Sequence, residues 1–156
     1  MASEHDIADR ELVLSRLLDA PRTLVFDTWS DAGHVSQWWG PAGFTTTTHE
    51  MAFKVGGRWR FTMHGPDGTD YPNIIVYTEI ARPERICYDH GDDESAENPV
   101  PNFKVVVTFE DRGGKTLLTL RMIVESAERL EEMKKFGAVE GGMQTLDRLE
   151  QYLAAH

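Results

Sequence analysis

AVEGGMQTLDRLEQYLA, the stretch from Ala138 to Ala154, decides the fold of this chain. Its apolar residues recur at spacings of three and four, the period of an amphipathic helix: Val139, Met143, Leu146, Leu149 and Leu153. We therefore predict a long C-terminal helix with one continuous apolar stripe. Gly141-Gly142 lies inside it, although each glycine costs a helix roughly 1 kcal/mol relative to alanine. Such glycines indicate a close backbone approach or room left beside the helix.

The sequence before this helix has the period of strands. From Phe44 onward apolar and polar residues alternate, and in Arg58–His64 the side chains of Trp59, Phe61 and Met63 share one face. Short turns rich in glycine and proline separate the runs, which is typical of an antiparallel meander. A sheet with one bulky apolar face must be covered on that face, and the C-terminal helix supplies the cover. The predicted strands are Phe44–Phe53, Arg58–His64, Ile74–Ile80, Arg85–His90, Asn102–Glu110 and Thr116–Glu125.

The N-terminal part adds one strand and two short helices. Residues 1–10 are polar and indicate a flexible leader, so we place a single domain at residues 11–156. Glu11–Leu18 is predicted as a strand and Arg22–Ser30 as a helix, and a second short helix then carries Trp38-Trp39. Neighbouring residues on a helix point about 100° apart. We therefore expect one of the two tryptophans inside and the other at a pocket mouth or a partner surface. Further along, Ser126 is expected to cap a helix that runs through Lys135.

The charge balance excludes several classes of partner. The 156 residues include 26 acidic and 16 basic side chains, a net charge of −10. Nucleic acids and anionic membranes both need a basic face, and none is concentrated here. No signal-peptide pattern and no apolar run of membrane-spanning length is present, so we expect a cytoplasmic protein. The single cysteine, Cys87, cannot form an internal disulfide and is expected to be a buried structural thiol.

Five local motifs in a fixed order carry a family resemblance. They are Trp38-Trp39-Gly40-Pro41, Phe53-Lys54-Val55-Gly56-Gly57-Arg58-Trp59, His64-Gly65-Pro66-Asp67-Gly68, Ile80-Ala81-Arg82-Pro83-Glu84-Arg85 and Phe136-Gly137-Ala138-Val139-Glu140-Gly141-Gly142. With them the chain, from Glu11 to Ala154, resembles the bacterial proteins named after the activator of the heat-shock chaperone ATPase, the AHSA family of the START-like, or SRPBCC, superfamily. The family often has an aspartate two residues before an Arg-Pro-Gly-Gly turn. Ala52 and Lys54-Val55 stand there instead, so no role of that aspartate carries over.

The resemblance implies a helix-grip fold. This is an α+β architecture in which a curved antiparallel sheet of about seven strands, two short helices and a long C-terminal helix enclose a cavity. Superfamily members range from lipid carriers and hormone receptors to cyclases and chaperone cofactors, so the fold alone does not define the function. A strongly curved sheet and one helix cannot fill the space between them completely, which favours a pocket for a small hydrophobic molecule.

Side chains on the predicted inner face are the candidates for ligand binding. Aromatic and methionine residues supply apolar area, and His90, Tyr88 or Glu140 would supply an orienting hydrogen bond. A packed core made of the same side chains is the alternative interpretation. The candidates are Trp39, Phe53, Trp59, Phe61, Met63, Tyr88, His90, Phe103, Val105, Met122, Phe136, Glu140 and Met143.

Three functions stay open at this point. The first is a binding module for a small hydrophobic molecule. The second is a cyclase or lyase in which His90 and Glu140 act as an acid–base pair inside the cavity; in the alternative interpretation, His90 lies in solvent at a strand end and Glu140 on the polar flank of the helix. The third is partnership with a chaperone, as the family name suggests.

Cofactors and metals are not expected. The chain has no phosphate-binding glycine loop after a strand, and no motif of a covalent or cofactor-dependent enzyme. The acidic run from Asp89 to Glu94 lacks the ligand spacing of a calcium loop, and the whole stretch from Gly91 to Pro101 is expected to be a solvated, mobile loop. A homodimer through the edge strands or the Trp38-Trp39 segment is a further expectation.

Overall fold

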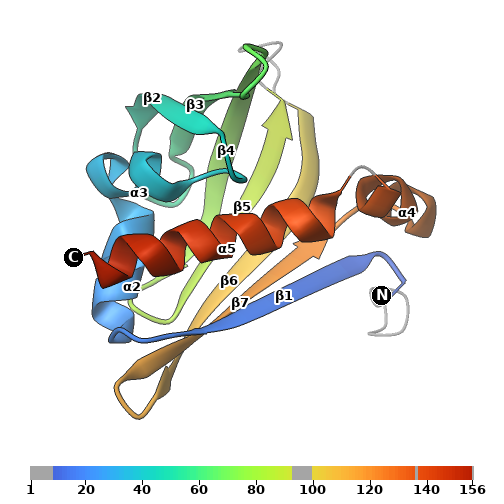
Figure 1. Ribbon diagram of the computed structural model, residues 1–156. Helices are drawn as coiled ribbons and strands as arrows, with labels where there is room; N and C mark the ends of the chain where they lie inside the picture. The colour runs from blue at the N-terminus through green and yellow to red at the C-terminus, as the bar shows by residue number, and fades with distance from the viewer. Residues whose placement is uncertain (1–8, 93–99, 136, 156) are drawn as a thin grey trace.

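The computed structural model describes residues 9–92, 100–135 and 137–155 and shows a sheet with a long helix across one face (Figure 1). The sheet has seven strands in the order β1-β7-β6-β5-β4-β3-β2, and all neighbours are antiparallel. The predicted meander and the curved α+β sheet are therefore confirmed. The strands are β1 (Glu11–Leu18), β2 (Thr45–Met51), β3 (Arg58–His64), β4 (Asp70–Ala81), β5 (Arg85–Asp92), β6 (Val100–Arg112) and β7 (Lys115–Ile123).

Strand ends differ from the sequence prediction where pairing or a tight turn decides them. β4 begins at Asp70 instead of Ile74, because these added residues pair with β3 as far as His64. β2 ends at Met51 instead of Phe53, since the chain turns there. A side chain on Gly57 would place its Cβ 2.0 Å from the backbone oxygen of Ala52, so this hairpin requires a glycine.

The described residues form four helices, close to the positions that the periodicity predicts. They are α2 (Arg22–Ser30), α3 (Ala32–Trp38), α4 (Ala127–Lys135) and α5 (Ala138–Ala154). The predicted Ser126 cap of α4 is confirmed, because the Ser126 hydroxyl accepts a hydrogen bond from the backbone N–H of Arg129 at 3.1 Å. α3 begins with a similar cap, in which the Asp31 carboxylate accepts from the N–H of Gly33 at 3.1 Å.

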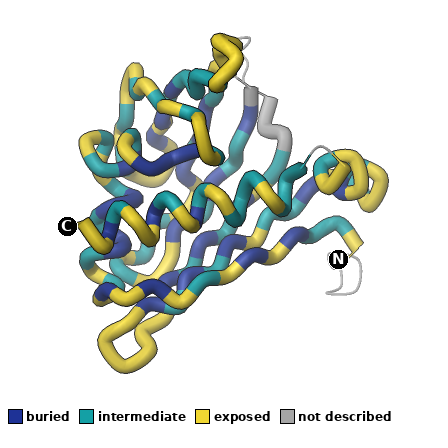
Figure 2. The backbone as a smooth tube through the Cα atoms, in the orientation of Figure 1, coloured by how far each residue is buried: buried dark blue, intermediate teal, exposed yellow. Residues whose placement is uncertain are grey.

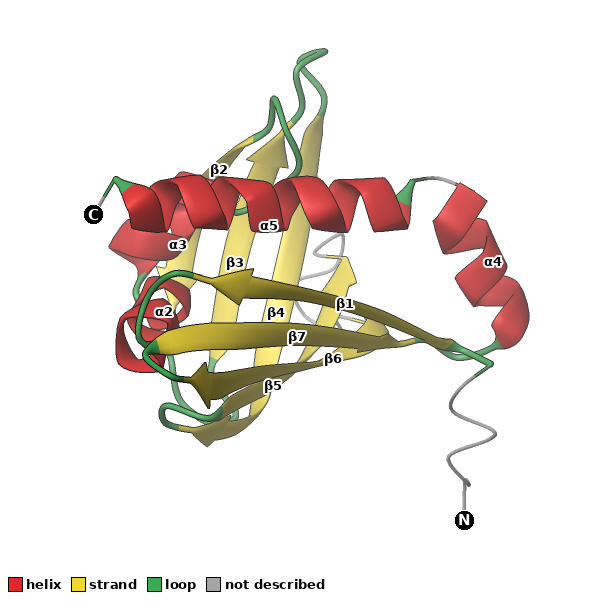
Figure 3. Ribbon diagram, turned by 60° about the horizontal axis from the view of Figure 1, so that its bottom comes forward, coloured by secondary structure: helices red, strands yellow, loops and turns green. Residues whose placement is uncertain are grey.

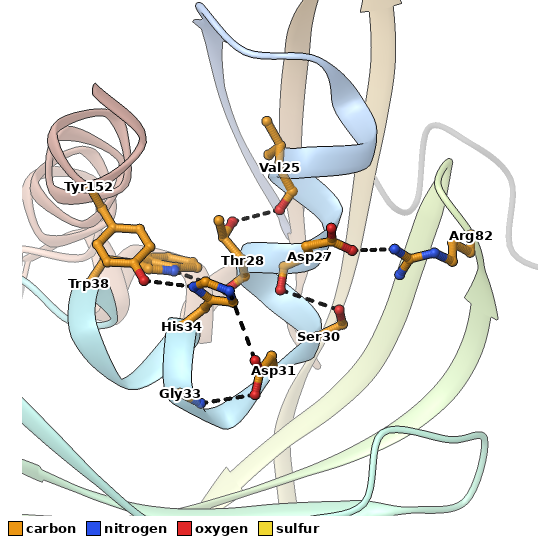
Figure 4. A network of polar contacts seen from close by, with 10 residues as sticks. All are labelled: Val25, Asp27, Thr28, Ser30, Asp31, Gly33, His34, Trp38, Arg82 and Tyr152. Atoms are coloured by element: carbon orange, nitrogen blue, oxygen red, sulfur yellow. Dashed lines mark hydrogen bonds and ion pairs between the residues drawn. The ribbon is translucent and has the colours of Figure 1, made fainter. Parts of the chain in front are cut away.

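Polar contacts fix the two short helices to each other and to α5 (Figure 4). The indole N–H of Trp38 donates to the backbone oxygen of Thr28 at 3.1 Å, which joins α3 to α2. The His34 ring and the Tyr152 hydroxyl are hydrogen bonded at 2.7 Å, which joins α3 to the end of α5. These two hydrogen bonds connect α2, α3 and the end of α5 at one end of the sheet.

α5 crosses the hollow side of the sheet (Figure 3), and its two halves differ in burial. The second half is buried at Leu146, Leu149 and Leu153, whereas the outward side of the helix is exposed (Figure 2). Val139 and Met143 in the first half are only half-buried. The predicted apolar stripe is thus fully buried only along its C-terminal half, whereas Val139 and Met143 pack against the edge of the core and stay half-buried.

The two glycines of α5 have different surroundings. A Cβ on Gly142 would lie 2.3 Å from Cδ1 of Leu14 in β1, so this position is a close helix–strand approach. A Cβ on Gly141 would meet nothing nearer than Cγ of Pro41 at 3.5 Å, an ordinary contact distance. The close backbone approach expected from the sequence therefore applies to Gly142, and the room beside the helix applies to Gly141.

The two expectations about burial have different outcomes. Trp38 lies in the core and Trp39 borders a cavity, as expected of the pair, but Trp39 is buried as well, because it has extended backbone beyond the last turn of α3. The expected burial of Cys87 is wrong. Cys87 is half-buried, since it lies on the opposite face of β5 from the buried Ile86 and Tyr88. Burial and the nearby Glu79 carboxylate raise the pKa of its thiol.

Several predictions fall at the edge of the described residues. Residues 1–8 of the predicted leader and residues 93–99 of the predicted loop lie outside them, as does Phe136. Arg10, at the end of the predicted leader, hydrogen bonds the backbone of Val124 with both its side chain and its carbonyl oxygen. In the described part of the chain, no helix is long and apolar enough to cross a membrane.

Candidate functional site

A cavity of about 490 Å³ lies between α5 and the sheet, within the ~300–1,000 Å³ usual for small-molecule sites. Strands β5, β6 and β7 form its floor, α4 and α5 form its cover, and the turn after α3 forms one rim. Most of the wall is apolar or glycine. The lining residues are Trp29, Trp39, Gly40, Pro41, Met63, Tyr88, His90, Phe103, Val105, Leu120, Met122, Arg129, Glu132, Met133, Gly137, Ala138, Gly141, Gly142 and Thr145.

Small residues on α5 keep this space open. Ala138, Gly141, Gly142 and Thr145 recur with helical spacing and all face the cavity. A helix normally fills the space beneath it with Leu, Ile or Phe. This segment of α5 has no large side chain on that face, so the curved sheet beneath it stays uncovered by side chains. The same spacing is visible in the sequence and could have located the cavity directly.

The Arg148 side chain holds the rim of the cavity in place. Its guanidinium donates to the backbone oxygens of Trp39, Gly40 and Pro41 at 3.0–3.2 Å, and to that of Gln37 at 3.3 Å. These oxygens lie at or just beyond the C-terminal end of α3, where a cation is favoured. Burial lowers the pKa of Arg148. Helix α5 therefore both covers the cavity and fixes the turn at its edge.

The structure places seven of the candidate residues on the cavity wall. They come from five separate segments of the chain and meet only in the folded protein: Trp39, Met63, Tyr88, His90, Phe103, Val105 and Met122.

Three aromatic candidates belong to the packed core behind the wall. Trp59 and Phe61 are stacked on each other with ring centres 4.0 Å apart, and Trp39 lies against both, at 4.8 and 5.8 Å. Phe53 packs edge-on against Tyr77 at 4.9 Å. These three residues do not line the cavity, because alternation identifies the inner face of the sheet but does not tell which inner residues are covered by others.

The two candidates on α5 also lie away from the cavity. Glu140 is exposed on the outer flank of the helix, and Met143 is half-buried but does not line the wall. The acid–base pair considered from the sequence is therefore not assembled, because His90 lies on the wall and Glu140 faces outward. Phe136, the remaining candidate, lies outside the described residues.

His90 is an ionisable group of the wall whose pKa is strongly shifted by burial. Its ring packs beside Phe103 with ring centres 4.9 Å apart, and its Nε2 lies 2.9 Å from Oδ1 of Asn73. Burial lowers the pKa of His90 to about 4, because the cationic form would lose its hydration. The imidazole is therefore neutral near pH 7.

Two further polar groups lie in or beside the same wall. Burial raises the pKa of the Tyr88 hydroxyl, and no described residue hydrogen bonds it. The indole N–H of Trp29 is buried without a hydrogen-bond partner among the described residues. Sequence analysis missed Trp29, because its helical spacing with Val25 is equally typical of a core residue.

A curved antiparallel sheet closed over a long C-terminal helix, with an apolar cavity between them, defines a helix-grip domain. The family model described as "Activator of Hsp90 ATPase homolog 1-like protein" matches residues 19–154, and the chain belongs to this family. The resemblance found from the sequence motifs is thereby confirmed.

Solved bacterial structures share this fold along nearly their whole length. A solution structure from Arthrobacter aurescens is 26% identical with a TM-score of 0.88, and covers 97% of this chain and 90% of its own. A crystal structure from Mycobacterium smegmatis is 26% identical with a TM-score of 0.86, and covers 99% and 98%. The AHSA1 protein from Silicibacter pomeroyi is 21% identical with a TM-score of 0.74, covers 93% and 98%, and supports the fold alone. Among curated proteins, none matches the sequence.

Proposed function

We propose that this protein binds a small, largely apolar molecule between α5 and the sheet. The observation that carries the proposal is the cavity of about 490 Å³ with its apolar wall. Small residues on α5 leave it open, and Arg148 fixes its rim. A cavity of this size lined by aromatic side chains with a few convergent polar groups is the usual form of a small-molecule site.

The two other functions considered from the sequence have less support. The cyclase or lyase considered from the sequence would pair His90 with Glu140 as acid and base, and Glu140 is exposed on the outer side of α5. Partnership with a chaperone is suggested by the family name alone. A homodimer stays a prediction from the sequence.

A fluorescent probe tests the proposal directly. N-phenyl-1-naphthylamine is apolar and uncharged, and its emission rises when it leaves water. We expect saturable binding to the wild-type protein and a higher melting temperature at saturation. Native mass spectrometry of protein purified from its own host would then search for a retained molecule.

Two matched variants connect the binding to this cavity. Val105→Trp puts an indole into the space, whereas Val106→Trp puts the same indole on the opposite face of β6. The first should abolish probe binding and the second should leave it unchanged, with melting curves to show that both fold. Equal binding by the wild type and the Val105→Trp variant would contradict the proposal.

A further inference from the structure

A short hydrogen-bonded chain fixes which nitrogen of His90 carries its proton. The side-chain amide of Asn73 donates through Nδ2 to the backbone oxygen of Tyr71 at 2.8 Å. The amide oxygen Oδ1 must therefore be the atom that faces Nε2 of His90 at 2.9 Å. A carbonyl oxygen only accepts, so Nε2 carries the hydrogen and Nδ1 keeps its lone pair.

Nδ1 of His90 is consequently an acceptor without a donor. None of the described residues hydrogen bonds this atom. The ring itself is part of the cavity wall and is surrounded by the rings of Phe103, Phe61 and Trp39, with ring centres at 4.9, 6.0 and 6.4 Å. Tyr88 lies beside it at 6.3 Å and is not hydrogen bonded to it. Apolar neighbours on these sides leave the cavity as the place from which a donor would come.

The other uncommitted polar groups of the wall are uncharged. Tyr88 lies two residues before His90 on the same face of β5 and presents a hydroxyl. Trp29, 5% exposed, borders the cavity with an indole N–H that has no partner among the described residues. Buried polar groups are nearly always hydrogen bonded, so unpaired ones beside a cavity indicate a missing ligand or water.

The described residues of the cavity wall offer a charged ligand no unpaired side chain of opposite charge. Among the described lining residues, Arg129 and Glu132 are the ones with a full charge, and they form an ion pair with each other at 3.3 Å. A carboxylate or ammonium group would lose its hydration on entering and gain no opposite charge. The wall therefore favours a ligand whose polar group is neutral.

We propose that the cavity selects an uncharged apolar molecule that presents a hydroxyl group, whose hydrogen is donated to Nδ1 of His90. This inference rests on the proposed function and adds the chemistry of the ligand's polar group. Tyr88 and Trp29 supply donors for the hydroxyl oxygen or for a second oxygen of the same ligand. Asn73 acts as a positioning residue, because it holds the imidazole in the form that accepts at Nδ1.

Three naphthalene derivatives test this chemistry in competition with N-phenyl-1-naphthylamine. 2-Naphthol has the hydroxyl, 2-methoxynaphthalene has the same ring and oxygen without the hydrogen, and 2-naphthoate has a negative charge. We expect 2-naphthol to bind about tenfold more tightly than the methyl ether, the worth of one hydrogen bond in a buried site. The naphthoate should bind more weakly than both.

The His90→Phe variant keeps a flat ring and removes the acceptor. Its preference for 2-naphthol over 2-methoxynaphthalene should therefore fall from about tenfold to none. Asn73→Leu should reduce the preference as well, because Nε2 loses its acceptor and the proton can move to Nδ1. Nitrogen-detected NMR of the free wild-type protein gives an independent readout: the Nε2–H form is expected.

Each result has a distinct meaning. Equal binding of 2-naphthol and its methyl ether, tightest binding of the naphthoate, or an Nδ1–H imidazole would overturn this inference and leave the proposed function standing. Failure of all three compounds and of the fluorescent probe to bind would instead refute the proposed function, and the inference would fall with it.

Discussion

Alanine substitutions at the two adjacent glycines of α5 should have different effects on stability: Gly141→Ala should stabilise the protein, and Gly142→Ala should not. Both replacements gain the helix preference of alanine and reduce the freedom of the unfolded chain, together worth about 0.5–1 kcal/mol. At Gly141 the new methyl group meets Pro41 at 3.5 Å, so the gain is kept. At Gly142 it would lie 2.3 Å from Cδ1 of Leu14, so Leu14 must move.

The expected magnitudes follow from these distances. Gly141→Ala should raise the free energy of unfolding by about 0.5–1 kcal/mol, which is about 1–4 °C in melting temperature for a chain of this length. Inserting a methyl group into a well-packed contact costs about 1–3 kcal/mol. Gly142→Ala should therefore be between unchanged and about 2.5 kcal/mol less stable than the wild type, depending on how far Leu14 can rotate.

Urea unfolding followed by tryptophan fluorescence measures both variants, with thermal melts as a second probe. Unchanged m values would show that the same surface is exposed on unfolding, so that midpoints can be compared. If Gly142→Ala were stabilised as much as Gly141→Ala, α5 would not approach β1 as described. The position of the helix over the cavity would then be wrong too.

Three other measurements test separate parts of the structure. Because burial lowers the pKa of His90 to about 4 from 6.5, the unfolded chain takes up this proton first as pH falls. The free energy of unfolding should thus decline between pH 6.5 and 4. His90→Phe should remove about 1–2 kcal/mol of that decline, which is less than the full pKa shift implies because the ring borders the cavity. A pH profile that the variant leaves unchanged would contradict the burial of His90. Arg148→Met should lower the free energy of unfolding by about 2–3 kcal/mol and weaken probe binding, since four carbonyl oxygens lose a charged donor. Arg16→Met, the control, breaks ion pairs with exposed partners and should cost under about 1 kcal/mol. Equal costs would contradict the role of Arg148 in holding the cavity rim. Cys87 should react with a disulfide reagent more slowly than a free thiol at pH 8, and Glu79→Gln should speed the reaction, because burial first and then this carboxylate raise the thiol pKa.

The fold was predictable because its signals are periodic and local. Alternation in β3 and the three-and-four spacing in α5 each report one face of one element, and the glycine turns set the order of pairing. Strand ends such as Asp70 were missed, since a strand can extend through polar residues wherever its neighbour offers a partner. Strand pairing depends on two segments of the chain, so it cannot be predicted from the sequence of one segment.

The site was predictable only to the level of a face. Tyr88, His90 and Met122 were correctly placed on the cavity side, because alternation fixes that side. Trp59 lies on the same side but behind Trp39, and this order of layers depends on where the turn after α3 leads the chain. His90 and Glu140 were paired on chemical grounds, but the rotation of α5 about its axis turns the glutamate outward.

The division of α5 into a core half and a cavity half has a consequence for how relatives could differ. The C-terminal half of the helix is held in the core by Leu146, Leu149 and Leu153. The size of the side chains in the other half can therefore change while the helix keeps its position. Replacing Ala138 or Thr145 by a larger residue would shrink the space for a bound molecule, and a smaller residue would enlarge it, in both cases without repacking these three leucines. A scaffold built in this way can exchange one guest for another by single changes along one helix, while its architecture stays the same.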